Sequence, residues 1–121
     1  MTINAVLEAV DALQPNAFSR EEKLAWLSRA EGFVKTQILD TCQDPPAFSG
    51  YSSQTDPETV LLVPAPFDEL YLRYIQAQMD SANGELTRYG NAAALYNSLF
   101  CANRNYYIRT HTPVGGKLNY F

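Results

Sequence analysis

The side chains that could carry out chemistry in this sequence are few, and they lie far apart along the chain. His111 is the single histidine and stands just before a proline, where a histidine at a helix end usually has a structural role. Cys42 and Cys101 do not match the ligand spacing of a zinc site. The carboxylates of Asp68 and Glu69 fall in the first turn of an expected helix, where acidic residues complement the helix dipole. We therefore expect no catalytic, metal or cofactor site.

The sequence also lacks the short motifs that bind nucleotides or carry a nucleophile. G-x-x-x-x-G-K, G-x-G-x-x-G and G-x-S-x-G are all absent from the 121 residues. We therefore predict that the protein is not an enzyme.

Nucleic-acid binding requires a basic surface, and the net charge of this chain is −4. The C-terminal third does interleave tyrosines with four basic residues: Arg88, Arg104, Arg109 and Lys117. Four basic residues over so long a stretch are too few to form a strongly basic surface. Glu21, Glu22 and Glu31 on the second expected helix would repel a phosphate backbone. Direct nucleic-acid binding is therefore not the favoured function.

Length and composition indicate one globular domain with a single modest core. Hydrophobic residues make up 46% and charged residues 18%, which argues against wholesale disorder. No apolar run approaches the roughly 18 to 20 residues that span a bilayer. No basic residue precedes Arg20, so a secretory signal is not expected. With two cysteines, a disulfide framework is not expected, and a reducing cytoplasm is the predicted compartment before assembly.

Charge is divided unevenly along the chain. Residues 1–69 hold 4 basic and 11 acidic residues, a balance of −7, whereas residues 70–121 hold 5 basic and 2 acidic residues, a balance of +3. The split is either sampling in a short chain or electrostatic complementarity between an acidic face on one copy and a basic face on the next. A head-to-tail contact of the second kind builds a ring if its rotation closes.

An apolar, tyrosine-rich stripe at helical spacing lies between Pro66 and Pro113. Its members are Phe67, Tyr71, Ile75, Met79, Ala82, Leu86, Tyr89, Ala93, Tyr96, Phe100 and Tyr107. Tyrosine has an apolar ring and a hydroxyl that needs a partner, so it suits a surface that is wet in the monomer and covered in an assembly. We therefore predict an interaction protein. The predicted subunit-interface residues are Tyr71, Tyr74, Arg88, Tyr89, Asn91, Tyr96, Asn97, Arg104 and Arg109.

Local signals predict two short helices in the first third of the chain. Residues 3–13 place Ile3, Val6, Leu7, Val10 and Leu13 on one face, and Thr2 can cap this helix. Ser19 and Glu22 form a capping box at the start of a second helix, which is expected to run to about Asp40. The turn-rich segment 41–57 predicts a long loop, in which Phe48 and Tyr51 pack onto something. Residues 59–63 are either a lone strand or, in our prediction, a buried extended segment.

The second half of the chain predicts helical structure from about Phe67 to the region of His111. Asn83-Gly84 and Gly90-Asn91 are both possible breaks. We predict two helices that meet near Asn83-Gly84, with one unbroken helix as the alternative because the stripe keeps its phase there. The predicted fold is all-α, a small bundle of about four helices over residues 1–112 followed by a C-terminal tail, 113–121.

Several segments together resemble small virion proteins of tailed phages and prophages, in the head–tail connector (adaptor) family. These segments are Ala65-Pro66-Phe67-Asp68-Glu69-Leu70-Tyr71, Tyr74-Ile75-Gln76-Ala77-Gln78-Met79-Asp80, Asn83-Gly84-Glu85, Arg88-Tyr89-Gly90-Asn91 and Tyr106-Tyr107-Ile108-Arg109-Thr110-His111-Thr112-Pro113. The resemblance covers roughly the second half of the chain, and its motifs are structural. Gly90 stands where the family usually has a second asparagine.

The resemblance implies a homo-oligomeric adaptor ring, expected to be a dodecamer, beneath the portal of the capsid in the virion neck. Such a ring extends the DNA channel, with DNA only as passing content, and receives a stopper or tail protein. It also implies that the C-terminal segment docks on the portal protein, which places portal docking on Val114, Lys117, Leu118, Tyr120 and Phe121. The long loop would either face the channel or grip a neighbouring subunit. No membrane partner is expected.

A function of a different class stays open at this stage. The same tyrosines would suit a small helical regulatory or inhibitor protein that binds a host or phage protein. Such a regulator would be absent from virus particles.

Overall fold

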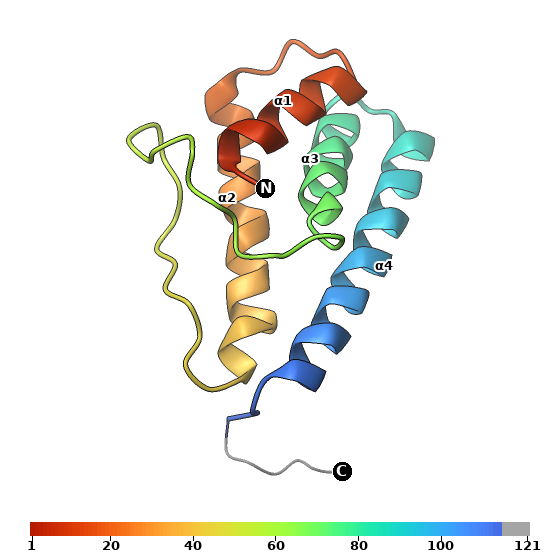
Figure 1. Cartoon of the computed structure of the whole chain (residues 1–121). Coiled ribbons are helices and arrows are strands. Elements are labelled where there is room, and N and C mark those ends of the chain that lie inside the picture. Colours follow the sequence, from red (N-terminus) through yellow and green to blue (C-terminus); the bar gives the residue numbers. More distant parts are fainter. Residues whose placement is uncertain (115–121) are drawn as a thin grey trace.

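The computed structural model describes residues 1–114, which form four α-helices and a short 3-10 turn (Figure 1). The helices are α1 (Ile3–Leu13), α2 (Arg20–Gln37), α3 (Glu69–Ala82) and α4 (Leu86–Thr110), and the turn is η1 (Leu39–Thr41). The predicted all-α fold with about four helices is confirmed.

Helix α1 begins and ends where the sequence predicts. The hydroxyl of Thr2 caps it by accepting from the Ala5 N–H at 3.1 Å. Four of the five predicted core residues of α1 are buried, but Leu13 is 44% exposed, so its assignment to the core was wrong. Leu13 lies in the last turn, where the chain leaves the core toward the Pro15 bend, and no other element covers it there.

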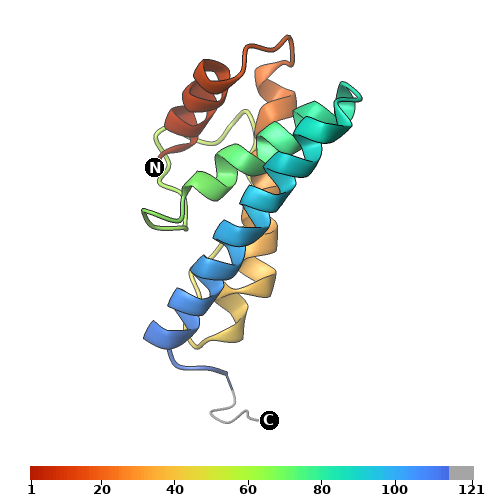
Figure 2. The same cartoon turned by 90° about the vertical axis from the view of Figure 1, so that its right-hand side faces the viewer.

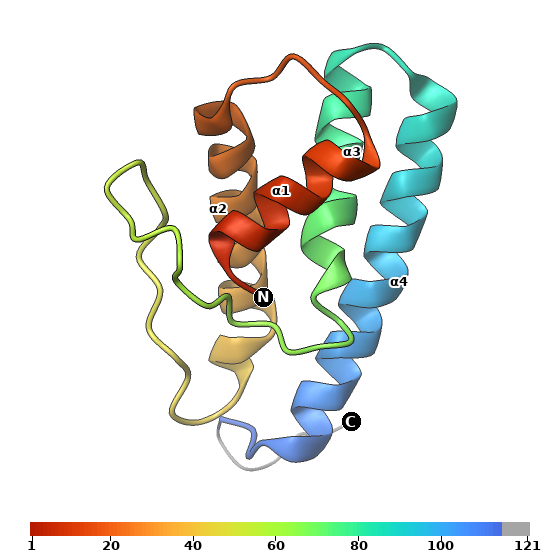
Figure 3. The same cartoon turned by 45° about the horizontal axis from the view of Figure 1, so that its top comes forward.

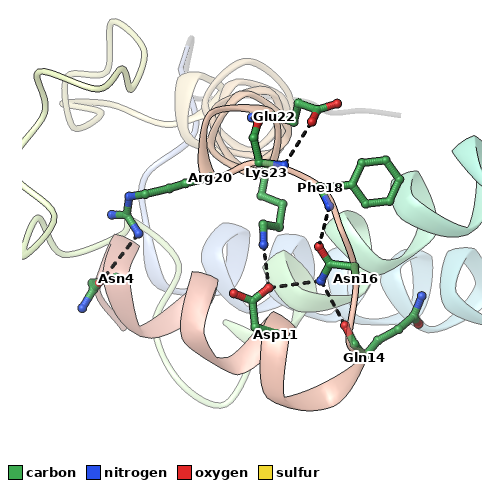
Figure 4. A network of polar contacts seen from close by, with 9 residues as sticks. Asn4, Asp11, Gln14, Asn16, Phe18, Arg20, Glu22 and Lys23 are labelled. Carbon is green, nitrogen blue, oxygen red and sulfur yellow. Dashed lines mark hydrogen bonds and ion pairs between the residues drawn. The ribbon is translucent and has the colours of Figure 1, made fainter.

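Polar contacts close the turn between α1 and α2 (Figure 4). Asp11 accepts from the Lys23 ammonium at 2.6 Å and from the Asn16 amide at 3.1 Å. Asn16 also accepts from the Phe18 N–H at 3.1 Å. The hydrogen bond from Lys23 lowers the pKa of Asp11 below its ordinary value, against a smaller opposing effect of burial. These contacts set the angle at which α2 leaves α1.

Helix α2 has the predicted capping box. The Ser19 hydroxyl accepts from the Glu22 N–H at 3.1 Å, and the Glu22 carboxylate accepts from the Ser19 N–H at 3.0 Å. The helix ends at Gln37 rather than near Asp40, because the chain tightens into η1 after Ile38. Both Ile38 and Leu39 are nevertheless buried, so the apolar face of α2 continues into the turn.

The turn at Asn83-Gly84 separates α3 from α4, as predicted, and excludes a single long helix. Gly84 has φ +73°, a conformation that glycine adopts without strain. The other possible break, at Gly90, lies within α4 and does not interrupt it. Helix α3 begins at Glu69, slightly later than the predicted start near Phe67, and the Asp68 side chain makes no capping hydrogen bond.

Three helices form a layer, and the fourth crosses one end of it. Helix α3 lies between α2 and α4 and contacts both (Figure 2). Helix α1 crosses α2 and α3 at the end where α2 begins (Figure 3). The first part of the segment from η1 to α3 runs along the side of α2 that faces away from α4, and the later part crosses α2 to reach α3 (Figure 1). The loop and α4 therefore form opposite edges of the bundle.

The segment 59–63 is buried at Leu61 and Val63, as predicted, but Val60 is 67% exposed and the chain bends at Leu62 and Val63. Its partner is the N-terminus of the chain, which sequence reasoning did not identify. The Ile3 N–H donates to the Thr59 carbonyl at 3.0 Å, and the Leu61 N–H donates to the Met1 carbonyl at 2.9 Å. This antiparallel contact is an isolated bridge between Thr2 and Val60 and does not extend into a strand.

A buried carboxylate joins three of these elements. Glu31 in α2 is 0% exposed, and its Oε2 accepts from the Tyr51 hydroxyl and the Leu62 N–H, each at 2.9 Å. Its Oε1 accepts from the Tyr71 hydroxyl at 2.5 Å. The Tyr71 hydroxyl accepts from the Val63 N–H at 3.0 Å. We call these five residues the Glu31 clamp.

The clamp corrects one expectation and confirms another. Glu31 was expected to repel a phosphate backbone together with Glu21 and Glu22, which is wrong for Glu31 because it is buried and donors from the loop and α3 surround its carboxylate. Tyr51 was expected to pack, and does. Burial, and then the charge of Glu31, raise the pKa of Tyr71 and of Tyr51 well above the ordinary tyrosine value. Both hydroxyls therefore remain donors at neutral pH.

Removal of the clamp acceptor should destabilise the fold strongly. Glu31→Ala leaves three donors without an acceptor, at about 1–3 kcal/mol for each buried group, so the free energy of unfolding should fall by about 3 kcal/mol or more. Glu31→Gln keeps the volume and one acceptor oxygen and should cost about 1–2 kcal/mol. Urea denaturation followed by circular dichroism measures both.

Glu21→Ala is the matched control, because Glu21 is exposed on the same helix. It should change the free energy of unfolding by about 0.5 kcal/mol at most. Equal stabilities for the Glu31→Ala and Glu21→Ala variants would contradict a structural role for the clamp.

Candidate functional site

Helix α4 is the longest helix and forms one edge of the bundle, packed mainly on α3. Its inward face is apolar but only partly covered. Ala92, Asn103 and Tyr107 are buried, whereas Tyr96 and Phe100 are half-buried. Large side chains remain exposed along the rest of the helix. These are Leu86, Tyr89, Leu95, Tyr106 and Ile108.

Two adjoining hollows lie along the inward side of α4. The first, about 230 Å³, is bounded by residues of α2, α3 and α4, and the second, about 180 Å³, by residues of α3 and α4. They share Tyr74, Tyr96 and Asn97, so we treat them as one feature, the aromatic groove. The remaining lining residues are Phe33, Gln37, Phe100, Ala77, Gln78, Tyr89 and Ala93.

Aromatic contacts connect the groove across the three helices. The Tyr74 ring lies 5.3 Å from Tyr96 and 6.2 Å from Phe33, both edge to face, and Tyr96 lies 5.7 Å from Phe100. Burial, with a smaller effect of Tyr74, raises the pKa of Tyr96 to about 12. Within residues 1–114, the hydroxyls of Tyr74, Tyr89 and Tyr96 make no hydrogen bond. The groove therefore offers rings for packing and hydroxyls for a partner.

Four of the nine predicted interface residues meet in this groove: Tyr74, Tyr89, Tyr96 and Asn97. Tyr71 does not, because it is 0% exposed and belongs to the Glu31 clamp. Its assignment to a subunit surface was wrong, since helix α3 turns this ring toward α2. Tyr74 is also largely covered, at 8% exposed, and presents only part of its ring to the groove.

The other four predicted residues lie on the exposed surface of α4, outside the groove: Arg88, Asn91, Arg104 and Arg109. Within residues 1–114, Arg104 and Arg109 take part in no ion pair. Arg88 differs, because its Nε lies 3.8 Å from the buried carboxylate of Asp80. Helix α4 contains no acidic residue, so its exposed charge is entirely positive.

Six residues that line the groove were not among the predicted site residues: Phe33, Gln37, Ala77, Gln78, Ala93 and Phe100. Phe33 and Gln37 of α2 line one wall, and Phe33 is 37% exposed. The available signal was helical spacing. Leu27, Ala30, Val34 and Ile38 form the buried stripe, and Phe33 lies beside it.

The C-terminal region is described only as far as Val114. Val114 is 59% exposed, and its N–H donates to the Thr41 carbonyl at 3.0 Å. The other residues predicted to dock on a portal lie outside the described residues: Lys117, Leu118, Tyr120 and Phe121. His111 stacks on Tyr107 at 3.7 Å and contacts its carbonyl at 3.0 Å, so the prediction of a helix-terminal structural histidine is confirmed.

A cluster of metal-ligating side chains and a membrane-spanning helix are both absent from residues 1–114. In this part of the chain, no group of three or more His, Cys, Asp or Glu side chains is placed to hold a metal ion. In the same residues, no helix combines the length and apolar character needed to cross a bilayer.

The partly buried hydroxyl of Tyr96 predicts a specific loss of stability at alkaline pH. Its pKa is raised in the fold, so its contribution is complete below pH 10 and is lost as pH rises toward about 12. Tyr96→Phe should remove this contribution. With allowance for solvent screening, the wild-type chain should lose about 1–2 kcal/mol more than the variant between pH 9 and pH 12.

Denaturation of both chains at a series of pH values measures the difference. Between about pH 7 and pH 9 the two stability profiles should stay parallel, which is the internal control. Profiles that remain parallel up to about pH 12 would contradict the assigned environment of Tyr96.

Comparison of the chain with protein-family models, with curated protein sequences and with solved structures finds no match.

Proposed function

We propose that this protein is a structural virion subunit that assembles through helix α4 into a homo-oligomeric adaptor ring at the head–tail junction of a tailed phage. The observation that carries the proposal is the aromatic groove along α4, on a helix whose exposed charge is all positive. The resemblance of the second half of the chain to head–tail connector proteins supplies the biological setting. The all-α fold is compatible with that setting.

The groove has the composition of a protein–protein contact. Aromatic residues are enriched at the centres of interfaces, because their rings supply area at a low cost in side-chain entropy. Tyr89 is 39% exposed, and Tyr96 and Phe100 are half-buried in the isolated chain. Cover by another subunit would remove this apolar surface from water and satisfy the tyrosine hydroxyls.

In the proposed assembly, the ring lies between the portal and a stopper or tail protein and extends the channel through which DNA passes. The C-terminal tail docks on the portal protein. The host cytoplasm is the compartment before assembly, and the virion neck is the compartment afterwards.

Analytical ultracentrifugation and electron microscopy test the assembly, with the chain alone and with portal rings encoded in the same genome. Oligomers or portal-bound rings are expected. Tyr89→Ala with Asn97→Ala should weaken assembly by about tenfold, because both exposed side chains line the groove. Glu21→Ala, on α2, is the control and should assemble like the wild-type chain.

Wild-type protein that stays monomeric at high concentration and also fails to assemble on portal rings would contradict the proposal. Immunoelectron microscopy separates it from a regulatory function. The adaptor should label the necks of particles, whereas a regulator would be absent from them.

Deletion of residues 114–121 tests the tail separately. The four helices end before this segment, so the truncated chain should retain its circular dichroism spectrum and melting temperature. Attachment to portal rings should be lost. Full attachment of the truncated chain would show that the tail is not required.

A further inference from the structure

The two edges of the bundle carry charges of opposite sign. The sequence from residue 36 to residue 72 contains no lysine or arginine, and the loop within it exposes Asp44, Asp56 and Glu58. Helix α4, at the other edge, exposes three arginines and holds no acidic residue. Figure 1 shows these edges on opposite sides of α2 and α3. Contact between the edges of two copies would therefore be attractive and head-to-tail.

The loop edge also contains a hollow. An open groove of about 470 Å³ lies among residues 47–62, and we call it the loop groove. Its apolar lining includes Phe48, Tyr51, Val60 and Leu62, and Val60 is 67% exposed. Asp56 and Glu58 lie in the chain between the lining residues Thr55 and Thr59 and are exposed, and we call these two residues the rim. An exposed valine beside two exposed carboxylates suits a partner with both apolar and cationic side chains.

The loop groove is held in a defined conformation by bonds to the helices. The Tyr51 N–H donates to the Ser28 hydroxyl at 3.0 Å, and the Tyr51 hydroxyl donates to Glu31 at 2.9 Å. The Asn4 N–H donates to the Pro57 carbonyl at 2.9 Å. A partner would therefore meet a preformed surface, which lowers the entropic cost of binding.

Helix α4 presents a strip of matching chemistry. Cys101, Arg104 and Ile108 are exposed at helical spacings of three and four, so they share one outward face, and Arg109 adjoins it. Ile108 is 42% exposed. We call these four residues the α4 strip.

We infer that the α4 strip of one copy docks in the loop groove of the next copy. Both halves of the contact are present on the same chain, with complementary charge and exposed apolar side chains on each. Because the halves lie on opposite edges, the contact leaves one free strip and one free groove and can propagate until a ring closes. This inference rests on the proposed function. It assigns the loop to the contact with the next subunit of the ring.

Charge exchange between the two edges is the first test. Arg104→Glu with Arg109→Glu reverses the strip. Asp56→Asn with Glu58→Lys reverses the rim, and the asparagine oxygen can still accept from the residue 58 N–H as Asp56 does at 2.9 Å. In sedimentation velocity, each double variant alone should assemble at least about tenfold more weakly than the wild-type chain, because like charges then face each other.

An equimolar mixture of the two double variants should regain assembly, because every strip then meets an oppositely charged rim. Melting temperatures should match the wild-type value, since none of these side chains is buried.

Unchanged assembly of the rim variant, where the wild-type chain assembles, would overturn the loop contact and leave the proposed ring standing. A wild-type chain that is monomeric both alone and with portal rings would overturn both.

Crosslinking tests the direction of the contact. Cys101 is exposed and Cys42 is buried, so Ser53→Cys adds a second reactive thiol, on the loop. Treatment with a short bis-maleimide should give a ladder of covalent multimers. The control, Ser53→Cys with Cys101→Ser, should give dimers at most. A product limited to dimers from the two-thiol chain would overturn the head-to-tail contact.

Discussion

The hydrogen bonds to the buried carboxylate of Glu31 are the interaction on which the rest of this structure depends. A carboxylate without solvent is tolerated only when donors surround it, and here the donors come from the loop, the extended segment and α3. Within residues 1–114, no lysine or arginine forms an ion pair with it. The clamp therefore couples the loop, the extended segment and α3 to α2.

The clamp also decides which surfaces remain open. It holds the loop against the outer side of α2, away from α4. Helix α4 has α3 as its main neighbour, and the ring of Tyr74 contacts Phe33 of α2 on one side and Tyr96 of α4 on the other. Acidic loop and basic helix are kept on opposite sides by the same arrangement. The aromatic groove, the α4 strip and the loop groove all follow from it.

The contact between α3 and α4 leaves buried hydrogen-bond acceptors without a donor, whereas both carboxylate oxygens of Glu31 in the clamp have donors. Within the described residues, the buried side-chain atoms without a hydrogen-bond partner are Asp80 Oδ2 and Asn103 Oδ1, one on α3 and one on α4. Gln14 donates to the other oxygen of Asp80 at 2.9 Å, and Arg88 approaches it from the exposed side. Each unmet group costs about 1–3 kcal/mol. Both unmet acceptors of the described residues therefore lie on the α3–α4 side of the bundle.

The fold class and the helix ends marked by caps and turns were determined by the sequence alone, because capping and turn chemistry act over a few residues. Thr2, the Ser19–Glu22 box and Gly84 each act on the adjacent backbone, and each marks a helix end as predicted. Burial could not be predicted in the same way, because it depends on segments distant in the chain. Tyr71 and Tyr89 share one stripe in the sequence, yet only the packing of α3 on α2 places Tyr71 in the core. The burial of Glu31 and the pairing of Met1 with Leu61 were likewise decided by tertiary structure, since their partners lie 20 or more residues away.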